Sequence, residues 1–142
     1  MGFSLVAATA IIGVSLIMCL EIIVGTTLPT ITDLNKSFDD MRNRAIEQVQ
    51  TYIEITNVTS VTNGSNYDIN ITVENKGSVS LQTAYFDILI NGIKNDFTCS
   101  KPYLYPGEEV YFNIFNISGS GENRLKIITS NGLSDYYLFI LT

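Results

Sequence analysis

The sequence predicts an all-β immunoglobulin-like β-sandwich preceded by an N-terminal transmembrane α-helix and an amphipathic helical stalk. Three observations lead to this fold class. The chain opens on a stretch, Phe3 to Val24, that is apolar or small apart from Glu21. Apolar residues then recur every three or four positions, as on one face of a helix. From Thr51 the period becomes two, and turn signals separate short apolar runs. We expect an anchor over 1–28, a stalk over 29–50 and an extracellular β-sandwich over 51–142.

The opening stretch has the length of a membrane span. At about 1.5 Å per residue it forms a helix of roughly 33 Å, close to the ~30 Å hydrocarbon core of a bilayer. A secretory signal peptide has a shorter apolar region, with basic residues before it and a small-residue cleavage site after it. Neither feature is present here. We therefore expect an uncleaved anchor, with a cleaved leader as the alternative; its residues include Phe3, Leu5, Ile11, Leu16 and Ile22.

The charges near the anchor bear on its placement. Glu21 lies near the end of the apolar stretch, where a carboxylate either reaches the headgroups or contacts a partner helix. Lys36, Arg42 and Arg44 follow the helix, which argues against an external C-terminal domain by the positive-inside rule. They are mixed with acidic residues, and the domain beyond is acidic. We expect that domain to lie outside the cell membrane.

The stalk begins after Pro29, which predicts a break or kink. Beyond it, one helical face is apolar, and the residues assigned to stalk packing are Leu34, Phe38, Met41 and Val49. This face either packs on the β-domain of its own chain or self-associates as a short coiled coil. Two to three heptads are too few to decide between the two.

The remainder reads as short strands joined by tight turns. Asn-Gly pairs at 63–64, 91–92 and 131–132 are hairpin signals, and Pro106-Gly107 suits a type II turn. In EVYFNIFNI, residues Val110, Phe112 and Ile114 face one way, and the residues between them face the other. About six to eight such strands, with turns every 8–12 residues, are typical of an immunoglobulin-like sandwich. The sequence leaves the strand pairing open.

Composition excludes several classes of function. The formal net charge is −6, so no basic patch exists to bind nucleic acid. The chain has no histidine, which removes the commonest general base and metal ligand. Its two cysteines, Cys19 in the apolar stretch and Cys99 in the distal domain, cannot reasonably pair. We expect no enzyme activity, no cofactor and no metal.

Five Asn-x-Ser/Thr sequons favour an exterior glycoprotein. The alternative is an Asn/Thr-rich β-protein whose sequons carry no glycan. The candidate glycosylation sites are Asn35, Asn57, Asn63, Asn70 and Asn116.

Several motifs together resemble one protein family. MGFS opens directly into the apolar stretch, and ITVENKGSVSL, YLYPGEE and KIITSNGLSDYY follow in the β-region. With the stalk, they resemble the FlaF (ArlF) family of accessory proteins of the archaellum, the archaeal flagellum used for motility. The resemblance implies a stator that binds the S-layer protein, so that the rotary motor has a fixed object to push against. It also implies a place between membrane and S-layer, a sister protein FlaG, the motor complex as neighbour, and a homodimer.

The binding surface and two rival functions remain open. The sandwich would bind its partner through a sheet edge or an aromatic patch, and Tyr103 and Tyr105 are the candidate contacts. One rival is a pilin or archaellin-like filament subunit, for which we expect a short basic leader ending in glycine before the apolar run. None precedes it here. The other rival is a generic membrane-anchored surface binding module.

A substitution in the stalk tests the helical periodicity. Burying a side chain such as Phe38 contributes roughly 1.5–3 kcal/mol. Phe38→Asp should therefore weaken either self-association, measured by analytical ultracentrifugation, or the stability of the domain, measured by chemical unfolding. If neither changes, the apolar face is not a packing surface.

Overall fold

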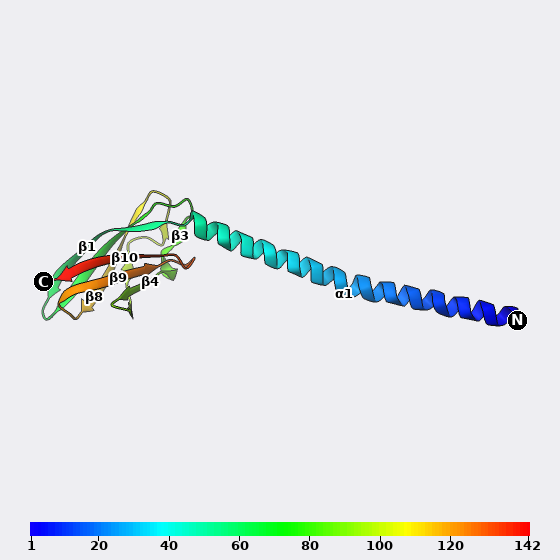
Figure 1. Cartoon of the computed structure of the whole chain (residues 1–142). Helices are drawn as coiled ribbons and strands as arrows, with labels where there is room; N and C mark the ends of the chain where they lie inside the picture. The colour runs from blue at the N-terminus through cyan, green and yellow to red at the C-terminus, as the bar shows by residue number, and fades with distance from the viewer. The chain divides into compact units, whose positions relative to one another are not determined.

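The computed structural model describes residues 1–142 and divides them into two units, Met1–Asn43 and Arg44–Thr142. Apart from Met1, the first unit belongs to helix α1 (Gly2–Gln50), whose last turns belong to the second unit. The second unit also holds a short 3-10 helix, η1 (Thr83–Tyr85), and ten strands (Figure 1). The strands are β1 (Ile53–Asn63), β2 (Asn66–Asn75), β3 (Leu81–Gln82), β4 (Asp87–Ile90), β5 (Ile93–Asn95), β6 (Thr98–Cys99), β7 (Tyr103–Leu104), β8 (Glu109–Ile117), β9 (Gly121–Ile128) and β10 (Ser134–Leu141).

Helix α1 continues through Pro29, so the predicted break is absent. A proline removes one backbone hydrogen bond, but the cooperative bonds of the turns on either side persist. Two threonine hydroxyls near Pro29 also bond to the helix backbone: Thr26 donates to the carbonyl of Ile22 at 2.6 Å, and Thr30 donates to that of Thr26 at 2.8 Å. The helix is long and apolar enough to cross a membrane, with a mean hydropathy of 2.4 in its most apolar window.

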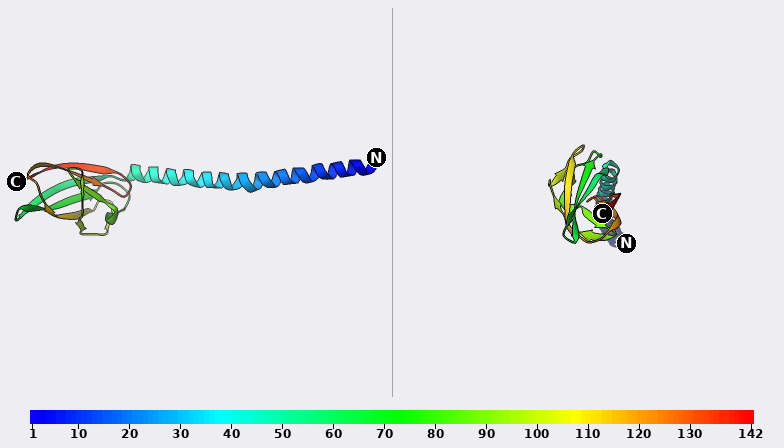
Figure 2. Two further views of the ribbon diagram at one scale, coloured as in Figure 1. Left: turned by 90° about the horizontal axis from the view of Figure 1, so that it is seen from below. Right: turned by 90° about the vertical axis from the view of Figure 1, so that its left-hand side faces the viewer.

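The strands form two four-stranded antiparallel sheets that face each other, as Figure 2 shows from two further directions. The first sheet has the strand order β1-β2-β8-β6, and the second has the order β10-β9-β4-β5. Strands β3 and β7 form a separate two-stranded ribbon. The predicted β-sandwich is therefore confirmed. The structure also supplies the strand pairing that the sequence left open.

The core lies between the two sheets and follows the predicted alternation. Val110, Phe112 and Ile114 of β8 are at most 1% exposed, whereas Phe115 on the other face is 58% exposed. The ring of Phe112 lies at the centre of an aromatic group, with centroids 5.6 Å from Phe86 and 5.2 Å from Phe97. Isoleucine, leucine and valine side chains from both sheets complete this core.

The turns have the backbone geometry that their sequences predict. Asn91 and Gly92 have φ of 51° and 85°, as the two central residues of a type I′ hairpin require. Gly107 has φ of 76°, and the amide of Glu108 donates to the carbonyl of Tyr105 at 3.0 Å, as in a type II turn. The Asn91-Gly92 turn thereby fixes the register of β4 and β5, which pair directly.

Two phenylalanines on β8 provide a matched test of the core. Phe112→Ala should lower the free energy of unfolding by about 3–5 kcal/mol, because it removes a buried ring and leaves a cavity. Phe115→Ala, on the exposed face of the same strand, should change it by less than ~0.5 kcal/mol. Chemical unfolding followed by near-ultraviolet circular dichroism measures both. Equal losses would contradict the orientation of β8.

Candidate functional site

The end of α1 is hydrogen-bonded to the loop that follows β2. The amide of Ser78 donates to the carbonyl of Gln50, and the amides of Lys76 and Gly77 both donate to the carbonyl of Tyr52, each at 2.9 Å. A Cβ atom on Gly77 would lie 2.5 Å from the amide nitrogen of Tyr52 and closer still to the carbonyl oxygen of Gln50. Only glycine therefore allows the loop to approach the helix end this closely.

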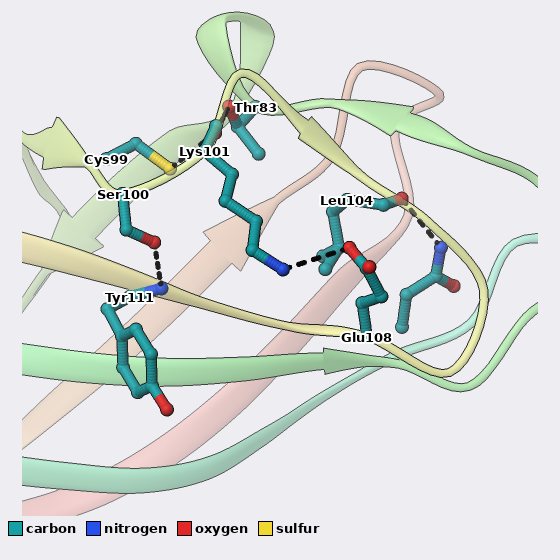
Figure 3. A network of polar contacts seen from close by, with 8 residues as sticks. Thr83, Cys99, Ser100, Lys101, Leu104, Glu108 and Tyr111 are labelled. Carbon is teal, nitrogen blue, oxygen red and sulfur yellow. Dashed lines mark hydrogen bonds and ion pairs between the residues drawn. The ribbon is translucent and has the colours of Figure 1, made fainter.

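The buried amide of Asn75 holds this loop in place. Asn75 is 0% exposed, and its Nδ2 donates to the carbonyls of Val79 at 2.8 Å and Leu104 at 3.1 Å. Its Oδ1 accepts a hydrogen bond from the amide of Gly77 at 3.0 Å. Figure 3 shows the bond accepted by Leu104, next to the ion pair of Lys101 and Glu108. One side chain thus connects β2, its following loop and β7.

A second set of bonds comes from the turn between β9 and β10. Gln48 Nε2 donates to the carbonyl of Asn131, and Asn131 Nδ2 donates to Thr51 Oγ1, each at 2.9 Å. Thr51 is 3% exposed, and its hydroxyl donates to the carbonyl of Glu47 at 2.6 Å. A hollow of about 460 Å³ lies beside these bonds. We call the two sets together the helix–sandwich joint: residues 48–52, 75–78 and 131.

The polar groups of the joint bond to one another, and these hydrogen bonds connect the helix end to two loops of the sandwich. No group of three or more His, Cys, Asp or Glu side chains is arranged to hold a metal ion.

The structure brings Tyr103 and Tyr105 together. Their rings stack with centroids 6.3 Å apart, and they are 44% and 52% exposed. The ion pair of Lys101 and Glu108, with a 3.1 Å separation, belongs to the same segment (Figure 3). These tyrosines therefore lie at the surface, not in the core. At the surface they can contact another molecule.

The anchor and stalk residues are also exposed in the single chain. Each is more than half exposed; they are Phe3, Leu5, Ile11, Leu16, Ile22, Leu34, Phe38, Met41 and Val49. Burial of these side chains therefore remains a proposal, by lipid for the first five and by the β-domain or a second helix for the others.

Four of the five sequons lie on the first sheet. Asn57 and Asn63 belong to β1, Asn70 to β2 and Asn116 to β8, whereas Asn35 belongs to α1. Asn57, Asn63 and Asn116 are exposed, whereas Asn70 is half-buried and donates to Asn113 Oδ1. The second sheet carries no sequon, so the two outer faces of the sandwich differ.

The outer face of the second sheet holds residues that the sequence analysis did not single out. Arg124 and Lys126 alternate along β9 with the buried Leu125 and Ile127, so both point outward. They lie over the ring of Tyr136, at 4.5 Å and 5.1 Å from its centroid. A hydrogen bond and the positive charge of Lys126 lower the pKa of Tyr136, with smaller contributions from Ser134 and Arg124. The alternation of polar and apolar residues in RLKII is the sequence signal that could have identified Arg124 and Lys126 as outward-facing.

The other lysines of the second unit are paired. Lys76 pairs with Glu54 and Glu74, Lys94 with Asp87 at 2.6 Å, and Lys101 with Glu108. Hydrogen bonding to Glu54 raises the pKa of Lys76, and hydrogen bonding to Asp87 raises the pKa of Lys94. Neither Arg124 nor Lys126 takes part in an ion pair.

Comparison with known proteins identifies the fold. No family model and no curated protein matches the chain. The archaellum periplasmic stator protein FlaG from Sulfolobus acidocaldarius is 21% identical over 63% of this chain and 99% of its own, with a TM-score of 0.54. A chain of the FlaF–FlaG periplasmic stator complex from that organism is 20% identical over 61% of this chain and 87% of its own, with a TM-score of 0.50. The archaeal flagellum of Methanospirillum hungatei strain JF1 is 15% identical over 96% of this chain and 93% of its own, with a TM-score of 0.75.

These likenesses agree with the family resemblance noted in the sequence. The two stator matches cover somewhat less than two thirds of the chain, and the flagellum match covers nearly all of it. The chain therefore has a fold that is found in archaellum stator proteins and in an archaeal flagellum.

Gly77 offers a direct test of the joint. Gly77→Ala places a methyl group against two backbone segments, so we expect a loss of about 1–3 kcal/mol in the free energy of unfolding. Hydrogen exchange at the amides of Lys76 and Ser78 should become faster, because their acceptors must move. Ser78→Ala is the control, since only its backbone amide is used. Unchanged exchange in the glycine variant would mean that the joint is loose.

Proposed function

We propose that the chain is a non-catalytic structural component of the archaellum and acts as a stator-type protein. The observation that carries this proposal is the likeness of the sandwich to archaellum stator proteins, of which FlaG is matched over 99% of its length. The motifs MGFS and SNGLSDYY support the FlaF family in particular. FlaG would be a partner of this chain, as the name of the FlaF–FlaG complex suggests for its own members.

In this proposal the apolar part of α1 anchors the chain in the cell membrane by a single pass. The sandwich lies outside, between the membrane and the S-layer, and binds the S-layer protein. Force on the sandwich reaches the helix through the joint, where the carbonyls of Gln50 and Tyr52 accept three backbone hydrogen bonds. Parallel bonds share a load, so a joint of this kind resists bending better than a flexible linker.

A contact that resists torque must dissociate slowly or act in many copies, because a single weak contact would slip under load. We therefore propose that the chain acts as a homodimer or in arrays. Tyr103 and Tyr105 are the proposed contacts with the S-layer protein, because both are exposed and their rings stack. Glycans on the sequons of the first sheet would mark an exterior glycoprotein.

A filament subunit is the second candidate. The match to the archaeal flagellum of Methanospirillum hungatei favours it, because that match includes both the helix and the sandwich. In this case the apolar face of α1 would pack against the helices of other subunits in a filament core rather than against lipid.

Fractionation of the source cells separates the two candidates. A stator should stay with the membrane and be absent from filaments sheared off the cell. A filament subunit should be a major component of those filaments. Quantitative immunoblotting of the two fractions measures the distribution, and accumulation in the sheared filaments would reject the stator proposal.

Binding to the S-layer protein tests the partner. The full chain in detergent should bind purified S-layer protein, and replacing both Tyr103 and Tyr105 by Ala should weaken binding by about tenfold or more, as expected for an aromatic hot spot. Tyr111→Ala is the control, because Tyr111 is similarly exposed at 45% but lies on β8. Failure of the unmodified chain to bind would remove the S-layer protein as the partner. Unchanged binding by the double variant would place the contact elsewhere on the sandwich.

A further inference from the structure

We propose that the outer face of the second sheet is a docking surface for an acidic segment of a partner protein. The surface consists of Arg124 and Lys126 on β9, and Tyr136, Leu138 and Ile140 on β10; we call it the β9–β10 face. This inference does not depend on the stator proposal, and it concerns a surface other than the Tyr103–Tyr105 pair.

The pairing between the two strands places these side chains in one patch. Tyr136 lies opposite Lys126, and Leu138 lies opposite Arg124. Leu138 and Ile140 are 61% and 64% exposed, although the residues that alternate with them, Phe139 and Leu141, are buried in the core. The patch therefore joins two exposed aliphatic side chains to two cations, with Glu122 opposite Ile140 at its edge.

The charges identify the kind of partner. The chain has a net charge of −6, and Lys76, Lys94 and Lys101 each pair with a carboxylate of the same sandwich. Arg124 and Lys126 pair with none, although they stand on adjacent outward positions of β9. Two unpaired cations in an acidic protein attract carboxylates, and an arginine can bind a carboxylate through two parallel hydrogen bonds.

The shape of the surface fits an inserted side chain. A hollow of about 380 Å³ is lined by Leu89, Asn91, Gly92, Arg124, Lys126 and Tyr136. Its basic groups come from β9 and its aromatic wall from β10. An aspartate or glutamate entering the hollow would meet both cations, while apolar neighbours in the partner would cover Leu138 and Ile140.

Two other occupants fit less well. Anionic lipid is typically recognised by clusters of four or more basic residues, and this face has two. A second copy of the chain would bring a sandwich in which Glu54, Glu74, Asp87 and Glu108 already pair with lysines. The sequons of the sandwich also lie on the first sheet, whereas the β9–β10 face has none.

Site-specific photo-crosslinking in intact cells tests the proposal with the full chain. Benzoylphenylalanine replaces Leu138, and in a control chain it replaces Phe115, which is similarly exposed on the first sheet. We expect the probe at 138 to form one dominant protein adduct whose mapped segment contains Asp or Glu. Charge reversal at Arg124→Glu and Lys126→Glu should reduce this adduct by about tenfold or more, and added salt should reduce it only when the cations are present. Lys101→Glu should leave it unchanged.

Several results would overturn the proposal. These are an adduct with lipid, an adduct with a second copy of the chain, a partner segment without carboxylates, or no adduct at 138. An adduct that survives the charge reversal would also overturn it. Because both substituted side chains point to solvent, the variant should keep the near-ultraviolet circular dichroism of the native chain. If it does not, Arg124→Ala with Lys126→Ala serves as the second variant, with the same expected loss.

Discussion

The hydrogen bonds of Asn75 are the constraint on which the organisation of the second unit depends. Its side chain lies without solvent contact among three backbone groups, and it satisfies all of them. Leaving a buried amide or carbonyl unpaired costs about 1–3 kcal/mol, so these contacts form together or not at all. Because the loop from 75 to 78 is fixed in this way, its amides are aligned to donate hydrogen bonds to the carbonyls of Gln50 and Tyr52 at the end of α1.

The joint also explains why the chain changes from helix to strand without a linker. Helix α1 ends at Gln50 and β1 begins at Ile53, whose side chain is 1% exposed in the core. The carbonyls at the end of a helix have no partner within the helix. Here the loop after β2 supplies the amide of Ser78 for the carbonyl of Gln50, and Gly77 leaves room for the approach. A stable helix end and a closed sandwich are therefore parts of one hydrogen-bonding arrangement.

Local rules were enough to predict the elements, because the forces that form them are local. The period of two in NYDINITVEN and the Asn-Gly pairs predict strands and hairpins that the structure contains. Strand order could not be predicted, since the pairing of β2 with β8 joins residues about forty positions apart. The β9–β10 face was missed, although the period of two in RLKII places Arg124 and Lys126 on one side of a strand; their position beside Tyr136 also depends on the pairing of β9 with β10. Tyr103 and Tyr105 were recognised as candidates from their residue type, but their exposure depends on the ribbon of β3 and β7.

The long apolar helix sets a physical requirement that a stator and a filament subunit share. Its side chains are exposed in the single chain, and an apolar surface of this length is stable only when lipid or other helices cover it. Lipid and neighbouring helices both favour apolar side chains, so the same sequence pattern suits a helix in a membrane and a helix in a filament core. The match to the archaeal flagellum spans 96% of this chain, whereas the match to FlaG spans 63% of it. What separates the two roles is the surface of the sandwich. A filament repeats one set of contacts between identical chains, whereas a tie to a fixed wall needs a surface complementary to a different protein. The proposed β9–β10 docking surface would have the second property, because Arg124 and Lys126 pair with no carboxylate of the chain and attract an acidic partner.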